Sequence, residues 1–492
     1  MSIKIFDDEP AKKPPINIFA ESGEPKTPAK PEPVLPAVSA ETPVDISEPI
    51  VEKKNNSFFD DSHSLAKKLN EKTLNEVSNE VIDTINREFP LSVLRQPEDE
   101  DRKKVKERIG VLVTQSMRKR QLTPGVAYEN SLTDELTRRL MGFGFLDLLL
   151  PPARNDITEI SIYSSGLVQV MKKGAVEFET IDVHPSPEEI ERVLDRLLGV
   201  QNKTLNETNP TVRAKLPRTK HNPGGGRIQA LHKCIAPPGQ NAAITIRLFE
   251  GKPVRPEWIL ERFEMSPEMM DTLKQAMSRG KRILITGGTG TGKTTLLSAI
   301  CNFLPQNWRI VKIEDPEELW IDRPTVQTIE VRPQALGTEV ASYTLANGVD
   351  DAMRMTPNYL ILGEVRDGIA ALALFRAFMT GHAGACTLHA DSPKEAVKRV
   401  AVLLSADAHV GRGDANQLFA DSIDLHVQIR IRFKHKRRLV TSISAVHDEL
   451  KGGEVWFDPL WEYDYAKSTP NREVWNKIAD LKFEEDEDEE GE

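Results

Sequence analysis

One glycine-rich stretch constrains this chain of 492 residues more than any other feature of its sequence. Residues 287–294 read Gly-Gly-Thr-Gly-Thr-Gly-Lys-Thr and fit the pattern G-x-x-x-x-G-K-[ST]. A short apolar run, Ile283–Ile285, precedes the stretch, and a helical segment, Thr295–Cys301, follows it. Glycine is needed because such a loop closes its backbone N–H groups around phosphate oxygens, in conformations that a side chain would block. Strand, loop and helix together predict a nucleoside triphosphate site.

The same spacing assigns roles to individual residues. Lys293 is expected to reach the terminal phosphates, the Thr294 hydroxyl is placed to ligate Mg²⁺, and the helix N-terminus adds its dipole. The predicted nucleotide-binding residues are Gly287, Gly288, Thr289, Gly290, Thr291, Gly292, Lys293, Thr294 and Thr295.

Hydrolysis needs more than binding, because a carboxylate must position or activate water. Two acidic clusters follow predicted strands: Glu314–Glu318 comes after Ile310–Ile313, and Gly363–Asp367 comes after Tyr359–Leu362. Ligand chemistry in open parallel sheets gathers at the carboxyl ends of the strands, so both clusters are expected to face the phosphate loop. From the residues alone, solvated loops remain the alternative.

Two histidines, His382 and His389, flank another short strand, Ala385–Leu388. Two interpretations stay open for them. Either they sense the γ-phosphate or hold the loop that carries Glu364, or they are structural histidines with satisfied hydrogen bonds. Their spacing does not suggest a metal centre.

The net charge of −10 is concentrated in the two ends of the chain. Residues 1–50 carry −4 and residues 484–492 carry eight acidic groups, which leaves +2 for residues 51–483. A nearly neutral body argues against sequence-independent nucleic-acid binding, which needs a strong basic surface. No apolar run is long enough to span a bilayer and no signal pattern opens the chain, so we expect it in the cytosol, where it could still dock on a membrane.

Five segments follow from composition and periodicity. Residues 1–63, with ten prolines in the first fifty, are expected to be a disordered arm, and 467–492 an acidic tail. Residues 64–142 have helical periodicity, 143–255 mix strands and helices, and 256–466 alternate apolar strands with helices, which predicts a buried parallel sheet. The basic stretch 434–438 is expected to be a solvated hairpin tip, with lipid or partner contact as the alternative.

In their order along the chain, these motifs resemble the nucleotide site of the secretion ATPases of bacterial type II and type IV secretion systems and type IV pili. Residues 287–294 correspond to its Walker A motif, 313–318 to its Asp box, 361–367 to its Walker B motif, and 380–390 to its His box. Segments 142–150, 226–230 and 244–247 are similar to the type IV secretion and tight-adherence-pilus branch. The missing Cys-x-x-Cys pair disfavours the type II assembly branch.

The resemblance implies an α/β fold in which a RecA-like P-loop domain, 256–466, follows a PAS-like domain, 143–255, and a small helical region. It also implies a hexameric ring with ATP and Mg²⁺ bound between the two domains. Glu318 then corresponds to a water-positioning carboxylate and Glu364 to the Walker B acid, which would act on Mg²⁺ with Thr294. Arg227 and Arg247 would face the nucleotide, whereas His382 and His389 would couple the site to ring movement.

The expected function is therefore that of a hexameric ATPase that hydrolyses ATP to power a type IV secretion, conjugation or pilus apparatus. The expected partners are further copies of the chain and platform proteins at the inner membrane, with which it would associate peripherally; no sequence-specific nucleic acid is expected. Two alternatives are a DNA translocase on a RecA-like core and a nucleotide-gated scaffold without turnover.

Overall fold

The computed structural model describes residues 71–482, except 96–97, 202, 264, 333–340 and 470–471. All elements below belong to one compact unit within residues 59–492. The predicted arm, 1–63, and the acidic run, 484–492, lie outside the described residues. Of the described helices, none has both the length and the apolar character needed to cross a membrane.

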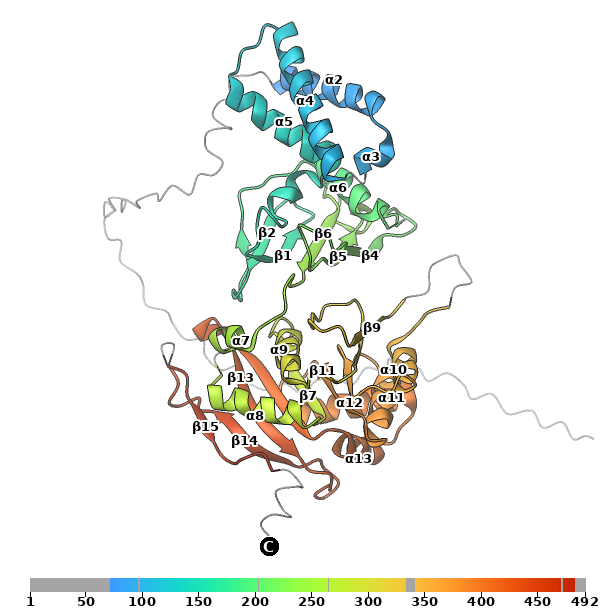
Figure 1. The fold of residues 1–492 in the computed structure, drawn as a ribbon, viewed down its shortest axis with the longest axis vertical. Coiled ribbons are helices and arrows are strands. Elements are labelled where there is room, and N and C mark those ends of the chain that lie inside the picture. The colour runs from blue at the N-terminus through green and yellow to red at the C-terminus, as the bar shows by residue number, and fades with distance from the viewer. Residues whose placement is uncertain are drawn as a thin grey trace, which may run out of the picture. The chain divides into compact units, whose positions relative to one another are not determined.

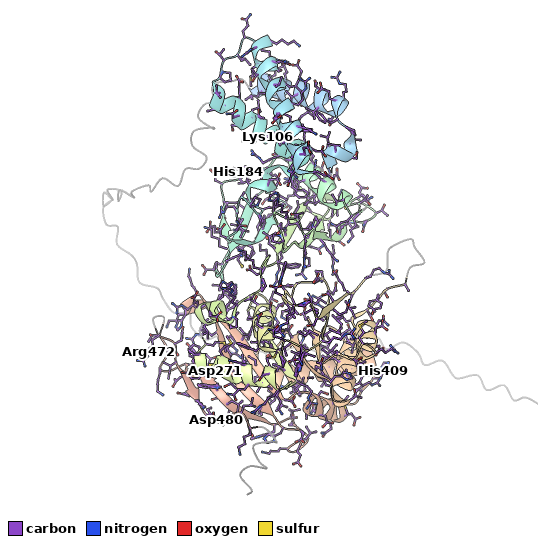
Figure 2. The ribbon with its side chains drawn as sticks, viewed as in Figure 1. Lys106, His184, Asp271, His409, Arg472 and Asp480 are labelled. Atoms are coloured by element: carbon purple, nitrogen blue, oxygen red, sulfur yellow. The ribbon has the colours of Figure 1, made fainter. Side chains whose placement is uncertain are left out.

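The first described part is helical (Figure 1) and consists of α2 (Glu71–Glu88), α3 (Leu91–Arg95), α4 (Asp99–Lys119) and α5 (Val126–Met141). Apolar residues three or four positions apart form its core. The most buried are Val77, Val81, Ile85, Val105, Ile109, Val113, Met117 and Leu136. An exposed ion pair of 2.7 Å joins Lys106 of α4 (Figure 2) to Asp134 of α5.

A six-stranded antiparallel sheet follows, in the order β3-β2-β1-β6-β5-β4. Its elements are η1 (Gly144–Leu148), β1 (Ile157–Ile162), β2 (Val168–Lys172), β3 (Glu179–Thr180), α6 (Pro187–Gly199), β4 (Thr211–Leu216), β5 (Gly226–Leu231), η2 (Lys233–Ile235) and β6 (Ala243–Leu248). Helix α6 begins with the capping box that Ser186 and Glu189 form. One face of the sheet packs with α6, through Ile160, Ile228 and Ile246, while alternate residues point to the other face. Likeness to a PAS domain remains a prediction.

The chain then forms a nine-stranded sheet in the order β15-β14-β13-β12-β7-β11-β10-β8-β9. The six strands from β12 to β9 are parallel, and β13, β14 and β15 extend the sheet in antiparallel fashion. The strands are β7 (Ile283–Gly287), β8 (Ile310–Glu314), β9 (Val326–Glu330), β10 (Tyr359–Leu362), β11 (Ala383–Leu388), β12 (Leu425–Arg432), β13 (Arg437–Val446), β14 (Phe457–Tyr463) and β15 (Trp475–Lys477).

Helices cover both faces of this sheet, which explains its nearly continuous apolar strands. Ile283 and Ile285 share one core with α7 (Pro256–Phe263), α8 (Pro267–Ser278) and α9 (Lys293–Ile300). Leu284, between them, belongs to a second core with α10 (Leu345–Met353), α11 (Gly368–Met379), α12 (Pro393–Ala408) and α13 (Arg412–Ser422). Two short 3-10 turns complete the elements, η3 (Cys301–Phe303) and η4 (Phe433–His435). The predicted mainly parallel α/β domain is confirmed.

The sheet extends beyond residue 466, where we expected a tail to begin. Strand β15 pairs with β14, and the Trp475 indole donates a hydrogen bond of 2.7 Å to the Val440 carbonyl. The strand pairing and this partly buried tryptophan therefore hold the segment on the sheet, although its surroundings in the sequence are polar and charged.

Candidate nucleotide site

The glycine-rich loop joins the end of β7 to the start of α9. Its glycines are required by the space and the backbone: a Cβ on Gly287 would lie 2.5 Å from the Ile429 carbonyl oxygen, and Gly292 has a φ of +95°. The backbone N–H groups of Gly290, Thr291 and Gly292 have no acceptor among the described residues. Consecutive N–H groups at a helix N-terminus form a concave site for an anion.

Lys293, the first residue of α9, is nearly buried beneath this loop. Its ammonium group donates hydrogen bonds of 3.0 Å to the carbonyl oxygens of both Gly287 and Gly288, and one of 3.2 Å to Nδ1 of His389. Burial lowers the pKa of Lys293 to about 8. A desolvated ammonium with only neutral hydrogen-bond acceptors is well suited to bind phosphate oxygens.

The contact with Lys293 fixes the tautomer of His389. An ammonium group can only donate, so Nδ1 of His389 accepts, and the ring proton lies on Nε2. Nε2 is 2.9 Å from Oε1 of Glu364 and donates to it. Lys293, His389 and Glu364 therefore form a hydrogen-bonded chain from the phosphate loop to the end of β10.

A second cation also holds Glu364. Arg366 Nε donates to Glu364 at 2.8 Å, and its Nη1 donates to Asp315 at 3.0 Å. Burial alone would raise the pKa of Glu364, but the hydrogen bonds from His389 and Arg366 lower it to about 2. Glu364 is therefore an ionised carboxylate with two fixed donors.

Glu314, the last residue of β8, has a role that the sequence did not reveal. Its Oε1 accepts from the backbone N–H groups of Glu318 (3.0 Å) and Leu319 (2.8 Å), and its Oε2 accepts from Lys312 at 3.1 Å. Both Lys312 and Glu314 are about 3% exposed, and burial raises the pKa of Glu314. This buried pair shapes the loop that presents Glu318. The signal in the sequence was a lysine in a core strand, two residues before the acid.

Charged side chains from four neighbouring strands of the six-stranded sheet form a row. Glu159 of β1 pairs with Arg247 of β6, which pairs with Arg227 of β5, which pairs with Lys215 of β4. Residues directly opposite in register share one face, so this charged row lies on the face away from α6. Arg247 Nη2 donates to Glu318 at 2.9 Å. Burial lowers the pKa of Arg227, and the neighbouring Arg247 lowers it further.

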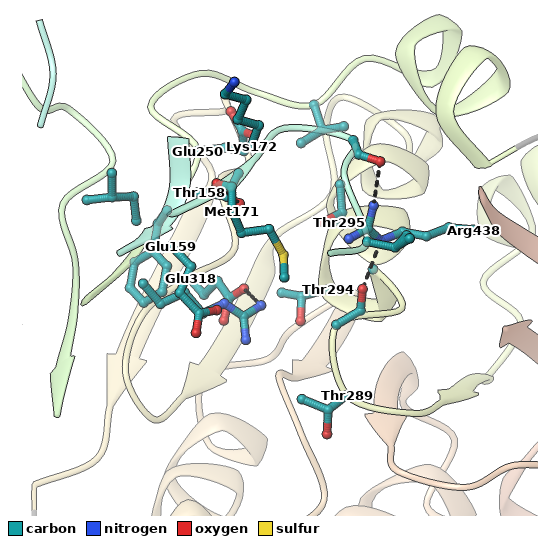
Figure 3. A pocket seen from close by; sticks show the side chains of 18 of the residues that line it. Thr158, Glu159, Met171, Lys172, Glu250, Thr289, Thr294, Thr295, Glu318 and Arg438 are labelled. Atoms are coloured by element: carbon teal, nitrogen blue, oxygen red, sulfur yellow. Dashed lines mark hydrogen bonds and ion pairs between the residues drawn. The ribbon is translucent and has the colours of Figure 1, made fainter. Parts of the chain in front are cut away.

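The charged row and the phosphate loop border one cavity of about 410 Å³ (Figure 3). Glu159, Arg247 and Glu318 line it together with Thr294 and Thr295. A smaller cavity of about 30 Å³ touches Thr294, Glu318 and Glu364. The structure thus brings together the predicted loop, both carboxylates, Arg247 and His389, whereas Arg227 lies opposite Arg247 in the sheet and lines neither cavity.

These residues fit Mg²⁺ that arrives with a nucleotide. Within the described residues, no three His, Cys, Asp or Glu side chains are grouped so as to hold a metal ion by themselves. Mg²⁺ typically takes only one or two protein ligands and otherwise binds phosphates and water. The Thr294 hydroxyl and the ionised Glu364, which border the same small cavity, match that requirement.

His382 lies elsewhere. It directly precedes β11, whereas His389 directly follows this strand, so the strand separates them by roughly 20 Å. His382 Nδ1 contacts the Thr380 hydroxyl (3.2 Å) and the Ala377 carbonyl (3.1 Å) at the end of α11. Within this chain, His382 therefore does not reach the phosphate loop.

The basic hairpin 434–438 is not simply a solvated tip. Arg438 lines the large cavity (Figure 3) and donates from Nε to the Gly290 carbonyl at 2.8 Å. Its other nitrogens donate to the carbonyls of Gly174 (3.2 Å) and Ala175 (2.8 Å). Sequence reasoning missed this residue, because nothing local marks one arginine among five basic positions.

The fold and this loop define a P-loop nucleotide-binding protein. Residues 205–435 match the family model described as "Type II/IV secretion system protein". This part of the chain is therefore similar to that family.

Three similar proteins illustrate the relationship. The type IV secretion system protein VirB11 of Bartonella quintana is 31% identical over 197 residues, 39% of this chain and 51% of that protein. A putative conjugal transfer protein of Mycobacterium tuberculosis is 27% identical over 340 residues, 68% of this chain and 92% of that protein. The solved structure of the ATPase DotB of Legionella pneumophila is 18% identical, covers 64% of this chain and 80% of that chain, and gives a TM-score of 0.44. The first three curated relatives, uncharacterised proteins of Methanocaldococcus jannaschii, are covered over only 34%, 64% and 27% of their lengths.

Proposed function

We propose that this protein hydrolyses ATP with Mg²⁺ and, as a hexameric ring, powers a type IV secretion, conjugation or pilus apparatus at the inner membrane. The observation that carries the catalytic part is the neighbouring pair Arg227 and Arg247 beside the phosphate loop. Like charges directly opposite each other on adjacent strands are unfavourable unless an anion compensates them. Within the described residues, the Arg227 guanidinium has no hydrogen bond or ion pair, and Arg247 has only Glu318.

A triphosphate supplies the missing negative charge. The N–H groups of the loop and the ammonium of Lys293 bind its phosphates, so Lys293 exchanges the carbonyl oxygens of Gly287 and Gly288 for phosphate oxygens. Bound Mg²⁺ neutralises charge on the phosphates. Arg227 and Arg247 stabilise the charge that develops on the transferred group, the role that arginines have in this class of reaction.

Two carboxylates compete for the role of positioning the attacking water, and their contacts favour Glu318. His389 and Arg366 both hold Glu364, whereas the carboxylate of Glu318 has only Arg247 as a partner among the described residues. When Arg247 turns towards the γ-phosphate, Glu318 is released next to Thr294 and is free to orient a water molecule. Glu364, still held by His389 and Arg366, then stays in place to bind Mg²⁺.

The transport role is supported by the likeness of residues 205–435 to the family of type II/IV secretion system proteins, and by two similar proteins named for type IV secretion and conjugal transfer. Three ion pairs join the six-stranded sheet to the loops around β8 and β9: Arg247 with Glu318, Arg218 with Glu317, and Lys215 with Glu330. Hydrolysis that alters the first pair can therefore change how the two sheets contact each other, which is how a nucleotide cycle produces movement.

The test is phosphate release by purified full-length protein with ATP and Mg²⁺, together with light scattering to measure assembly. We expect turnover by the wild type, no turnover by Lys293→Ala with an unchanged circular dichroism spectrum, and ATP-dependent hexamers. Assembly without phosphate release would favour the scaffold alternative. Strong stimulation by DNA would favour the translocase.

A further inference from the structure

We propose that Arg438 is a positioning residue that orients a phosphate-binding N–H of the glycine-rich loop and ties that loop to the six-stranded sheet. The inference rests on the proposed ATP site and adds a residue outside its four motifs. It starts from the Gly290–Thr291 peptide unit, whose carbonyl oxygen accepts from Arg438 Nε at 2.8 Å.

The geometry of a peptide unit links this contact to the phosphate site. In a trans peptide, the carbonyl of one residue and the N–H of the next point in opposite directions. The Gly290–Thr291 bond is not among the cis bonds of the described chain. By holding the Gly290 carbonyl outward, Arg438 directs the Thr291 N–H towards the interior of the loop, where it has no acceptor among the described residues.

Glycine makes this restraint necessary. Gly290 is exposed, has a φ of +71°, and a Cβ added to it would meet no atom within 4 Å. Glycine loses more conformational freedom on ordering than any other residue. A fixed charged donor on the carbonyl therefore selects one orientation of this peptide from several that glycine permits.

The remaining nitrogens of Arg438 extend the connection. Nη1 and Nη2 donate to the carbonyls of Gly174 and Ala175, in the segment between β2 and β3 (Figure 3). One planar guanidinium thus bridges the phosphate loop and the six-stranded sheet, a geometry that a lysine cannot reproduce. Movement of that sheet away from the loop would break the bridge, free the peptide and weaken the hold on phosphate.

A matched control lies two residues away. Lys436 joins the same two segments through an exposed ion pair of 2.8 Å with Glu177, but makes no contact with the phosphate loop. Arg438→Gln and Lys436→Gln remove the same charge from the same hairpin. Of the two residues, only Arg438 contacts the phosphate loop, at the Gly290 carbonyl.

The experiment measures ATP hydrolysis and ATP affinity, by titration calorimetry, for full-length wild type, Arg438→Gln, Arg438→Lys and Lys436→Gln. For Arg438→Gln we expect about tenfold weaker ATP affinity and a KM raised to the same extent, with kcat within about twofold, because the N–H binds phosphate equally in ground and transition states. Lys436→Gln should match the wild type. Arg438→Lys should restore only part of the affinity, because lysine keeps the charge but lacks the planar guanidinium that reaches both segments.

Three results would overturn the inference: unchanged affinity in Arg438→Gln, equal losses in both Gln variants, or full recovery with lysine. If Arg438→Gln fails to fold, as judged by thermal unfolding, the ATP affinity of Arg438→Lys decides. An affinity below that of the wild type supports the inference, and an affinity equal to it overturns the inference. Absence of ATP binding by the wild type would instead contradict the proposed function.

Discussion

Arg227 lies directly opposite Arg247 in the β5–β6 ladder, and only Arg247 of the two has an acidic partner among the described residues. Two cations held side by side lower the stability of the sheet. Arg247 lines the cavity beside the phosphate loop, so a bound anion there would compensate this repulsion.

Arg227→Gln should therefore separate stability from activity. Without nucleotide, we expect its thermal unfolding midpoint to equal or exceed that of the wild type, because the substitution removes a repulsion of about 0.2–1 kcal/mol. ATP turnover should fall by about 10²-fold or more, because a cation that stabilises the transition state is lost. Calorimetric scanning and phosphate release measure the two effects. A clear loss of stability would mean that the Arg227 stem contributes more through packing than its charge costs.

Glu318→Gln should bind ATP with nearly normal affinity and hydrolyse it about 10²–10⁴-fold more slowly, because an amide cannot accept the proton of the attacking water. Single-turnover measurements with labelled ATP distinguish the chemical step from product release. Glu364→Gln is the companion variant, in which we expect Mg²⁺-dependent ATP binding to weaken as well. Normal turnover in Glu318→Gln would transfer the water-positioning role to Glu364.

His389→Ala should reduce kcat because Glu364 loses one of its two donors and Lys293 loses one acceptor. We expect a decrease of about 10- to 100-fold. His382→Ala is the positional control: it lies at the other end of β11, so the affinity of the isolated protein for ATP should not change. Weaker ATP binding in His382→Ala would show that this histidine reaches a site in another copy of the chain.

ATP binding should take up protons in mildly alkaline solution. The pKa of Lys293 is about 8, below its ordinary value of 10.5, so at pH 8.5 a large share of these amines is neutral. Bound phosphate favours the ammonium form and raises the pKa. Calorimetric titrations in two buffers of different ionisation enthalpy should therefore give different apparent enthalpies at pH 8.5 and nearly equal ones at pH 7. Equal enthalpies at both pH values would contradict the prediction.

The same pKa predicts the pH dependence of stability without nucleotide. Between pH 8 and 10.5 the unfolded chain binds more protons at Lys293 than the folded chain does, so the contribution of this residue to the free energy of unfolding increases with pH. Lys293→Met should lack this increase.

Glu314→Ala should destabilise the protein by about 1–3 kcal/mol for each donor left unsatisfied, because the N–H groups of Glu318 and Leu319 lose their acceptor. The buried ammonium of Lys312 also loses one of its two carboxylate partners and keeps the other, Glu317. The double variant Lys312→Met with Glu314→Ala should recover part of that loss. Chemical denaturation of the four proteins in this double-mutant cycle measures the coupling. Additive effects would show that the ion pair contributes nothing beyond its separate side chains.

Local sequence rules predicted the elements that carry the phosphate site. Tyr359–Leu362 forms a strand with the predicted bounds, and the loop from residue 287 to 294 joins a strand to a helix as expected. Both succeed because buried parallel strands and phosphate loops impose strong local demands on residue type. Glu159 and Arg438 could not be predicted in this way, because their roles depend on register and on contacts between residues far apart in the sequence.

The charged row also determines which changes to the chain the site can tolerate. Its members keep their spacing because each is hydrogen-bonded into a strand, and successive residues of a strand point to opposite faces. Deleting one residue from β5 ahead of Arg227 would turn the arginine into the apolar core and bring Ile228 to the cavity, with composition and net charge almost unchanged. Length variation in this sheet should therefore be confined to its turns.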